Sequence, residues 1–218
     1  MAVIEDHSLF AESLEIALEM EGHDVRRIVL PEGGRSVHTL LPIIMRAKPR
    51  VALLDLDLGT YGNGGRLVEP LTLAGVNVVV VTSSIDRGRW GECVRYGARK
   101  ILPKSSPLND ILATIRRITE GLPVMTQDER EELLKHWHAQ VQEIQLIRSR
   151  LENLTHRESQ VLAQLMDGRA VREIARMSVV SEATVRTQVK SILSKLEVSS
   201  QLAAVGCAHH VGWAPAGA

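Results

Sequence analysis

Carboxylate side chains stand directly after two short apolar runs near the start of the sequence. Glu5 and Asp6 follow "AVI", and Asp55 follows "VALL". If both runs are parallel strands of one sheet, their carboxyl ends meet at the edge where open α/β sheets bind ligands. Three carboxylates at one edge repel one another and raise one another's pKa, unless a divalent cation lies among them. Mg²⁺ commonly takes one or two carboxylates together with water, so this pattern predicts a Mg²⁺ site.

A hydroxyl and an ammonium group follow two later apolar runs. Thr82 closes "NVVVVT", and Lys104 follows "ILP". Groups of this kind can bind an anion that is carried by one of the carboxylates. The combination predicts an aspartate that accepts a phosphoryl group, with Mg²⁺ and Lys104 neutralising charge and Thr82 holding an oxygen. Each residue alone is better explained as a solvated strand end. Only their occurrence together at four strand ends favours a chemical role.

The elements that must position these residues follow from the hydrophobic pattern of residues 1–120. Short apolar runs alternate with amphipathic segments, which is typical of an α/β fold. We expect five strands and five helices in a flavodoxin-like, doubly wound parallel sheet. Helical patterns cover 8–22, 37–50 with Pro42 kinking or delaying the start, 67–74 interrupted by Pro70, and 107–121. The expected strands are Ala2–Ile4, Val25–Leu30, Val51–Leu54, Val76–Val81 and Ile101–Leu102.

Beyond residue 120 the pattern becomes helical throughout. Thr126 and Glu129 form a capping box that opens a helical linker over 121–150. Its heptad-like apolar spacing fits either a helix packed on its own domains or a dimerisation helix, and both interpretations stay open. Residues 151–218 predict an all-α, four-helix domain with a helix-turn-helix arrangement. We therefore divide the chain into domains 1–120, 121–150 and 151–218.

Composition limits the classes of function. The chain has 218 residues with 26 basic and 26 acidic side chains, so bulk charge does not indicate a polybasic nucleic-acid binder. No apolar run approaches the roughly 20 residues of a membrane helix. The start "MAVIEDHS" lacks the basic region of a secretory signal. Two distant cysteines fit a reduced compartment, and we expect a cytoplasmic protein without membrane contact.

The segment 181–196 has the pattern of a DNA-reading helix. An apolar stripe must pack inward, and the opposite side presents small, hydroxylated and basic residues, which fit a major groove. Ser181 and Thr184 at its start can donate hydrogen bonds to a phosphate. A solvated surface helix would carry the same Arg and Lys residues. The outward candidates are Ala183, Arg186, Thr187, Lys190 and Ser194.

These features resemble a known family. Residues 1–120 resemble the receiver domain of bacterial two-component response regulators. The stretch "LTHRESQVLAQLMDGRAVREIARMSVVSEATVRTQVKSILSKLEVSS" resembles the signature of LuxR/NarL-type DNA-binding domains. The resemblance implies that Asp55 is the phosphoacceptor, with phosphoryl contacts from Thr82 and Lys104. It also implies a Mg²⁺ site made by Glu5, Asp6, Asp55 and the main-chain carbonyl of Asp57.

The resemblance further implies a regulator that binds double-stranded promoter DNA as a homodimer and pairs with a sensor histidine kinase. By this resemblance Arg186, Thr187 and Lys190 read bases, while Thr184 and Lys195 contact the DNA backbone. The last helix, from Gln201 to about 209, would form the dimer contact on DNA.

Several positions depart from the family pattern. Leu58-Gly59 replaces the usual Met-Pro, the following loop is one residue longer, and Ile101 stands where an aromatic residue often reports phosphorylation. Pro103 precedes Lys104, Gln188 replaces a usual His, and Gln201 replaces a common Arg. One alternative is therefore an orphan regulator that works without phosphorylation. Another is a haloacid dehalogenase-like phosphatase using the Asp-x-Asp of "LLDLDLGT", although that motif ends the first strand in that family and the third here.

Overall fold

A computed structural model of the chain describes residues 1–31, 33 and 36–215. Its backbone divides into two compact units, Met1–Ala139 and Gln140–Ala218, and the division falls inside one long helix. The end of the expected third domain, 216–218, lies outside the described residues. Among the described residues, no helix is long and apolar enough to cross a membrane.

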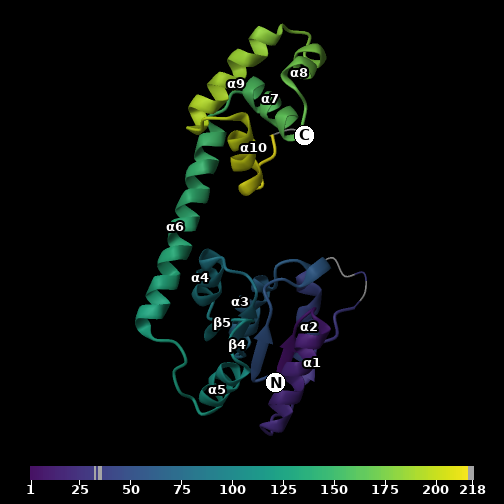
Figure 1. Cartoon of the computed structure of the whole chain (residues 1–218), viewed down its shortest axis with the longest axis vertical. Helices are drawn as coiled ribbons and strands as arrows, with labels where there is room; N and C mark the ends of the chain where they lie inside the picture. The colour runs from purple at the N-terminus through teal and green to yellow at the C-terminus, as the bar shows by residue number, and fades with distance from the viewer. Residues whose placement is uncertain (32, 34–35, 216–218) are drawn as a thin grey trace. The chain divides into compact units, whose positions relative to one another are not determined.

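The first unit is built on a five-stranded parallel sheet in the order β2-β1-β3-β4-β5 (Figure 1), which confirms the expected doubly wound topology. β1 and β3 have the expected bounds, while β4 and β5 differ from them by one residue at each end. Only β2 is much shorter than expected, because it is an edge strand that pairs solely with the three-residue β1. The strands are β1 (Ala2–Ile4), β2 (Arg26–Arg27), β3 (Val51–Leu54), β4 (Asn77–Thr82) and β5 (Lys100–Pro103).

Both faces of the sheet are covered by helices, because alternate strand residues point to opposite sides. Val3, Leu53 and Val79 belong to the core under α1 and α5. Ile4, Leu54 and Val80 belong to the core under η1, α2, α3 and α4. The helices of this unit are α1 (Ser8–Met20), η1 (Val37–Leu40), α2 (Leu41–Arg46), η2 (Gly59–Tyr61), η3 (Gly64–Leu67), α3 (Val68–Leu73), α4 (Arg87–Arg95) and α5 (Leu108–Thr119).

Two helices show how local residues set the bounds. Pro42 lies in the first turn of α2 and delays the α-helix behind a 3₁₀ turn, as the sequence predicts. The sequence "RGRWGECVR" of α4 gives no clear apolar stripe, so this helix is not located by periodicity. Asp86 nevertheless starts it firmly, since its carboxylate accepts hydrogen bonds from the amides of Gly88 and Arg89 at 2.9 and 3.1 Å.

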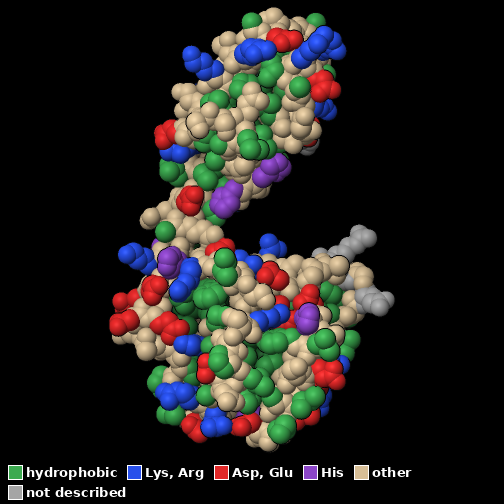
Figure 2. All heavy atoms as spheres, viewed as in Figure 1, with side chains coloured by type: hydrophobic (Ala, Val, Ile, Leu, Met, Phe, Trp, Pro, Cys, Tyr) green, Lys and Arg blue, Asp and Glu red, His purple; other side chains and the backbone are tan. Residues whose placement is uncertain are grey.

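The long helix α6 (Gln127–Glu152) begins at the expected cap, where the Thr126 hydroxyl accepts from the Glu129 amide at 3.2 Å. Acidic side chains gather over its start (Figure 2), which suits the positive end of a helix dipole. Leu133 is buried in the core of the first unit and Leu151 in that of the second. At both ends, therefore, α6 packs on its own chain.

A glycine sets how closely α6 packs on α4. A Cβ built on Gly91 would lie 2.1 Å from the Leu133 carbonyl oxygen and 2.8 Å from the Trp137 Cβ. No larger residue fits there without moving a backbone. The Arg95 guanidinium also lies 5.9 Å from the Trp137 ring centre, and Lys100 bonds to Glu129 at 2.7 Å. The start of α6 therefore packs as an integral part of the first unit.

The second unit is helical, as expected, with α7 and α9 enclosing an apolar core that also includes α8 and α10. Its centre contains fully buried side chains such as Leu162, Ile174 and Ile192. α8 and α9 form the helix-turn-helix, joined by a short turn. The helices are α7 (His156–Met166), α8 (Val171–Met177), α9 (Glu182–Leu196) and α10 (Gln201–His210).

The close approach of α4 and α6 predicts a specific mutational effect. Gly91→Ala should destabilise the first unit by about 1–3 kcal/mol, because its methyl group overpacks against helix backbone. Gly206→Ala in α10 is the matched control, since a Cβ there meets nothing within 4 Å. That control should gain about 0.5–1 kcal/mol from helix propensity. Urea unfolding measures both, and a Gly91→Ala protein as stable as the wild type would contradict this packing.

Candidate functional site

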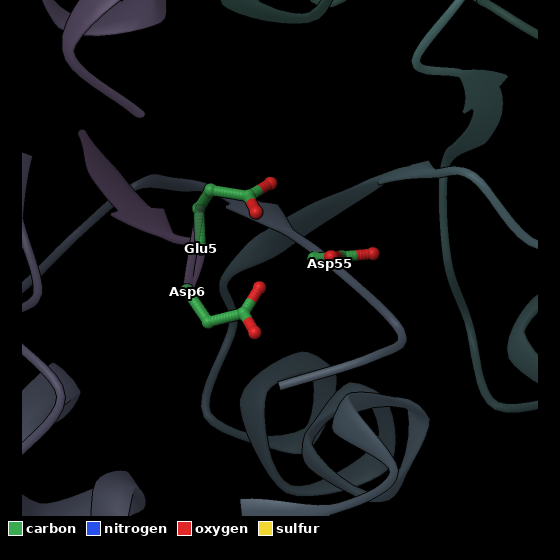
Figure 3. A group of neighbouring side chains, drawn as sticks. All are labelled: Glu5, Asp6 and Asp55. Atoms are coloured by element: carbon green, nitrogen blue, oxygen red, sulfur yellow. The ribbon is translucent and has the colours of Figure 1, made fainter. Parts of the chain in front are cut away.

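Three carboxylates meet at the carboxyl edge of the sheet. Glu5 and Asp6 follow β1 and Asp55 follows β3, and these neighbouring strands pair Ile4 with Leu54. Each residue offers a carboxylate oxygen, and these oxygens all lie within 4.8 Å of one another (Figure 3). Glu5 and Asp55 are buried, whereas Asp6 is exposed and opens the cluster to solvent. The sheet thus brings together the three side chains that the sequence predicts as metal ligands.

Lys104 joins this cluster from the end of β5. Its ammonium donates to Glu5 Oε1 at 2.7 Å and to Asp55 Oδ2 at 2.8 Å, and it lies 5.2 Å from the Phe10 ring centre. Pro103 is accommodated because β5 is an edge strand and needs no further ladder donor. Three carboxylates against one ammonium leave an excess of negative charge.

The electrostatics of the cluster reflect its burial. Burial raises the pKa of Glu5, against the opposing hydrogen bonds from Lys104 and the His7 amide, and the nearby Asp55 carboxylate adds to the increase. Burial also disfavours the charged form of Lys104, but its bonds to Asp55 and Glu5 outweigh this effect and raise its pKa. The lysine therefore stays protonated and holds two carboxylates together.

One oxygen of Asp55 is left without a protein partner. Oδ2 accepts from Lys104, whereas the buried Oδ1 has no hydrogen-bond partner among the residues that the structure describes. A buried carboxylate oxygen normally has such a partner. Beside two further carboxylates, this orphaned atom fits a site for a hard cation and a transferred oxyanion. The donor set suits Mg²⁺, since every ligand is an oxygen.

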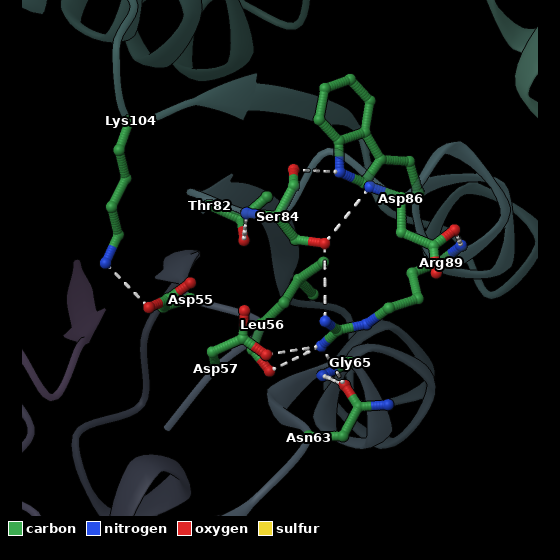
Figure 4. Close-up of polar contacts among 11 residues, drawn as sticks. Asp55, Leu56, Asp57, Asn63, Gly65, Thr82, Ser84, Asp86, Arg89 and Lys104 are labelled. Carbon is green, nitrogen blue, oxygen red and sulfur yellow. Dashed lines mark hydrogen bonds and ion pairs between the residues drawn. The ribbon is translucent and has the colours of Figure 1, made fainter. Parts of the chain in front are cut away.

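Thr82, the predicted phosphoryl contact, is fully buried at the end of β4, next to β3 (Figure 4). Its hydroxyl oxygen accepts from the Ser84 amide at 3.1 Å. The Ser84 hydroxyl in turn accepts from the Asp86 amide at 3.3 Å. The Thr82 hydroxyl is therefore hydrogen-bonded into the loop that leads to α4.

The glycine-rich loop after Asp55 is compact. The amide of Leu58 donates to the Gly62 carbonyl at 3.0 Å, and Tyr61 is buried with its hydroxyl donating to the Pro31 carbonyl. A Cβ on Gly64 would lie 2.0 Å from the Asp55 carbonyl oxygen, so only glycine fits there. Gly59 has a φ of 54° and approaches the Asp6 carboxylate, which makes glycine suitable at this point.

Asp57 has a partner that the sequence does not reveal. Its carboxylate is 60 % exposed and accepts from the Arg89 guanidinium at 2.9 Å (Figure 4). The family resemblance implies only a backbone role for this residue. Arg89 lies on α4, the helix that lacks a periodic pattern, so no local signal marks it as a neighbour of the site.

In the second unit, α9 presents the predicted DNA-facing residues. Its stripe of Val185, Val189, Ile192 and Leu196 is buried, as expected. Ser181 caps the helix by accepting from the Thr184 amide at 3.1 Å. Lys and Arg side chains lie over α8 and α9 on the visible face (Figure 2). The candidates Ser181, Thr184, Arg186, Thr187 and Lys190 are all exposed.

Lys195 differs from the other candidates. Its ammonium donates to Glu158 Oε2 at 2.7 Å and to the Asn153 carbonyl at 3.1 Å. Ser191 also donates to Glu158, at 2.6 Å, and the Thr155 amide completes the capping box of α7 at 2.7 Å. The ammonium of Lys195 is thus engaged inside the domain, and a phosphate contact would have to share it.

The bonds to Glu158 control its ionisation. Burial alone raises the pKa of this carboxyl, but the hydrogen bonds from Lys195, Ser191 and Thr155 outweigh burial and lower its pKa to about 2. The carboxylate is therefore charged at neutral pH and ties α7 to α9. It supports the helix that carries the candidate DNA-reading residues.

A doubly wound sheet with an acidic, lysine-containing site, followed by a helix-turn-helix unit, defines the class of two-domain transcription regulators. Comparison with known proteins makes the assignment specific. The family described as "Response regulator receiver domain" matches residues 1–116, and "Bacterial regulatory proteins, luxR family" matches residues 152–208. The chain therefore belongs to the response regulators with a LuxR-type DNA-binding domain, the family that the sequence predicts.

Individual relatives agree with this assignment. The chain is 24% identical to the transcriptional regulatory protein DesR of Bacillus subtilis over 211 residues, which cover 97% of this chain and 96% of DesR. It is 31% identical to the response regulator protein VraR of Staphylococcus saprophyticus over 174 residues, 79% of each chain. A structure of the RcsB response regulator of Salmonella typhimurium has a TM-score of 0.50 at 20% identity, covers 94% of this chain and 96% of its own, and shows the same fold. DesR and VraR are both described as regulators.

The bonds to Glu158 predict a pH-dependent stability of the second unit. The folded pKa is lowered from an ordinary 4.5 to about 2, so the unfolded state binds the proton first as the pH falls. The stabilisation is therefore complete above pH 4.5 and disappears between there and pH 2. Glu158→Gln should cost about 3 kcal/mol at pH 7 and flatten this dependence.

Denaturant unfolding of the second unit at several pH values measures both effects. Glu197→Gln is the control, because its carboxylate pairs with Arg150 but is 67 % exposed, and it should cost under about 1 kcal/mol. Equal losses in the two variants would show that Glu158 makes no special contribution.

Proposed function

We propose that this response regulator is controlled by phosphorylation of Asp55. The observation that carries the proposal is the buried, orphaned Oδ1 of Asp55 beside Glu5, Asp6 and Lys104. Mg²⁺ would be held by the carboxylates of Glu5, Asp6 and Asp55 and by the main-chain carbonyl of Asp57. Thr82 and Lys104 would contact the phosphoryl group. The alternative, a regulator of the same fold that works without phosphorylation, is motivated by Ile101, which is buried in the core where an aromatic switch residue is common.

In this proposal the residues of the chain position the reacting groups and stabilise the charge of the transferred phosphoryl group. A carboxylate oxygen of Asp55 attacks the phosphorus of a phosphodonor, and the bond from phosphorus to the leaving group breaks with its electrons going to that group. When held by Glu5, Asp6 and Asp55, Mg²⁺ would supply positive charge that stabilises the negative charge developing during the transfer. Lys104 already contacts Asp55 and remains close to neutralise the product anion, while the Thr82 hydroxyl can donate to one of its oxygens. The phosphodonor in cells would be a sensor histidine kinase.

For the second unit we propose major-groove recognition by α9. Arg186, Thr187 and Lys190 would reach base edges, while Ser181 and Thr184 would bind phosphate at the helix start. Lys195 would add a backbone contact only by sharing its ammonium with Glu158. Two copies would bind promoter half-sites as a dimer, with α10 at the contact. In this scheme 1–120 is the receiver domain, 121–150 the linker and 151–218 the DNA-binding domain.

Phosphorylation can be tested by intact mass after incubation with a small phosphodonor and saturating Mg²⁺. The wild type should gain one phosphoryl group, and Asp55→Asn should gain none. Asp57→Asn is the matched control, because it changes a neighbouring carboxylate but keeps the main-chain carbonyl, and it should still be modified. A wild type that gains no mass would instead favour the phosphorylation-independent regulator.

DNA recognition can be tested on a duplex that the wild type selects from a random-sequence pool. Lys190→Ala should weaken binding about tenfold, within the range of a lost base contact. Lys135→Ala removes the same charge from the exposed face of α6 and should leave binding unchanged. Gln201→Arg should steepen the salt dependence by about one unit, because it adds a phosphate contact. Wild-type affinity in Lys190→Ala would refute the placement of α9 in the groove.

A further inference from the structure

Arg89 connects two loops that border the acceptor site. It projects from the first turn of α4, and its guanidinium reaches acceptors on both loops (Figure 4). Nη1 lies 3.5 Å from the Ser84 hydroxyl, in the loop after Thr82. Nη2 donates to the Leu56 carbonyl at 3.1 Å, to Asp57 Oδ1 at 2.9 Å and to Asn63 Oδ1 at 3.2 Å.

The helix that carries Arg89 is itself fixed. Asp86 caps α4, and the Trp90 indole donates to the Ser84 carbonyl at 3.0 Å. The Arg89 side chain is only 26 % exposed. A planar guanidinium with several acceptors is preorganised in a way that a single exposed ion pair is not. The Arg89 side chain is therefore held in one position by its hydrogen bonds, unlike an exposed charged side chain.

The hydrogen bonds of Arg89 reach both arms of the glycine-rich loop, the segment that leaves β3 and the segment that returns toward η3. Leu56 and Asp57 form the outgoing arm, directly after Asp55. Asn63 lies on the returning arm, pairs with Asp57 through an isolated β-bridge, and accepts from the Gly65 amide at 2.9 Å. One guanidinium thus bonds both arms and fixes the backbone that follows the acceptor residue.

We infer that Arg89 is a positioning residue for the Mg²⁺ site: it holds the loop that presents the Asp57 carbonyl to the cation. The inference rests on the proposed function, because it concerns the same Mg²⁺. Arg89 does not touch the cation and acts through Asp57 and its loop. Groups that orient metal ligands in this way commonly change metal affinity by about 10–100-fold when they are removed.

Charge and geometry make opposite predictions for this residue. A guanidinium near a cation site repels Mg²⁺, so loss of its charge alone would tighten binding. Loss of its fork geometry would loosen the loop and weaken binding. Arg89→Lys separates these effects, because lysine keeps the charge but cannot bond both arms with a planar fork.

The test is a Mg²⁺ titration of the full-length protein, read as the thermal stabilisation of the first unit. A ligand that binds only the folded state lowers the apparent unfolding constant by the factor 1 + [Mg²⁺]/Kd. The Mg²⁺ concentration at which this constant has fallen twofold, here called the midpoint, therefore equals Kd. Arg89→Lys should shift the midpoint about tenfold to higher Mg²⁺. Arg87→Lys is the matched control on the same helix, since Arg87 pairs with the exposed Glu132 at 3.6 Å, and its midpoint should equal that of the wild type.

Three outcomes would overturn the inference. A wild-type midpoint in Arg89→Lys would show that the fork does not position the loop, and a lower melting temperature without Mg²⁺ would then make Arg89 merely structural. A lower midpoint would mean that another effect dominates. If the wild type itself shows no stabilisation by Mg²⁺, the proposed function fails and this inference falls with it, which distinguishes that failure from the other two.

Discussion

The structure of the first unit depends on holding three carboxylates at one edge of a sheet. Like charges this close destabilise the fold unless something balances them. β1 and β3 are buried on both faces, so their register and therefore the positions of Glu5 and Asp55 are set by the apolar core. Lys104 supplies the one ammonium that the described residues bring to these two carboxylates, and it comes from the far end of the unit's sequence. Hydrophobic packing thus fixes an electrostatic arrangement that favours a bound cation.

The glycine-rich loop follows from the same constraint. The chain must turn immediately after Asp55 without covering the carboxylates. Gly64 passes so close to the Asp55 carbonyl that a side chain would collide with it, and Gly59 turns beside Asp6 with a positive φ. Tyr61 anchors the loop tip in the core. The loop is therefore closed and well packed although it lacks the usual proline and has one extra residue.

The sequence predicts the parts of this protein that depend on local patterns. β1 and β3 have the expected bounds because each is a short apolar run ended by a carboxylate. The caps of α6 and α7 follow from Thr-x-x-Glu spacing, and the stripe of α9 from its period. Contacts between distant segments carry no such signal. Arg89 with Asp57, Gly91 with Leu133, and Lys195 with Glu158 depend on tertiary packing, so residue type and spacing alone do not reveal them.

Three consecutive residues of α4 contact three different parts of the first unit. None of these contacts can be predicted from the sequence alone. Neighbouring side chains on an α-helix point about 100° apart, so consecutive residues face different partners. Arg89 bonds the glycine-rich loop after Asp55, Trp90 bonds the loop after β4, and Gly91 packs on α6. Ile101, buried in the core, has an aliphatic side chain that cannot form a polar link to these loops. Polar links from the glycine-rich loop after Asp55 run into α4 through Arg89, and α6 packs closely on α4 at Gly91. A change at the glycine-rich loop that displaced Arg89 would therefore act on the packing of α6 through a single rigid element.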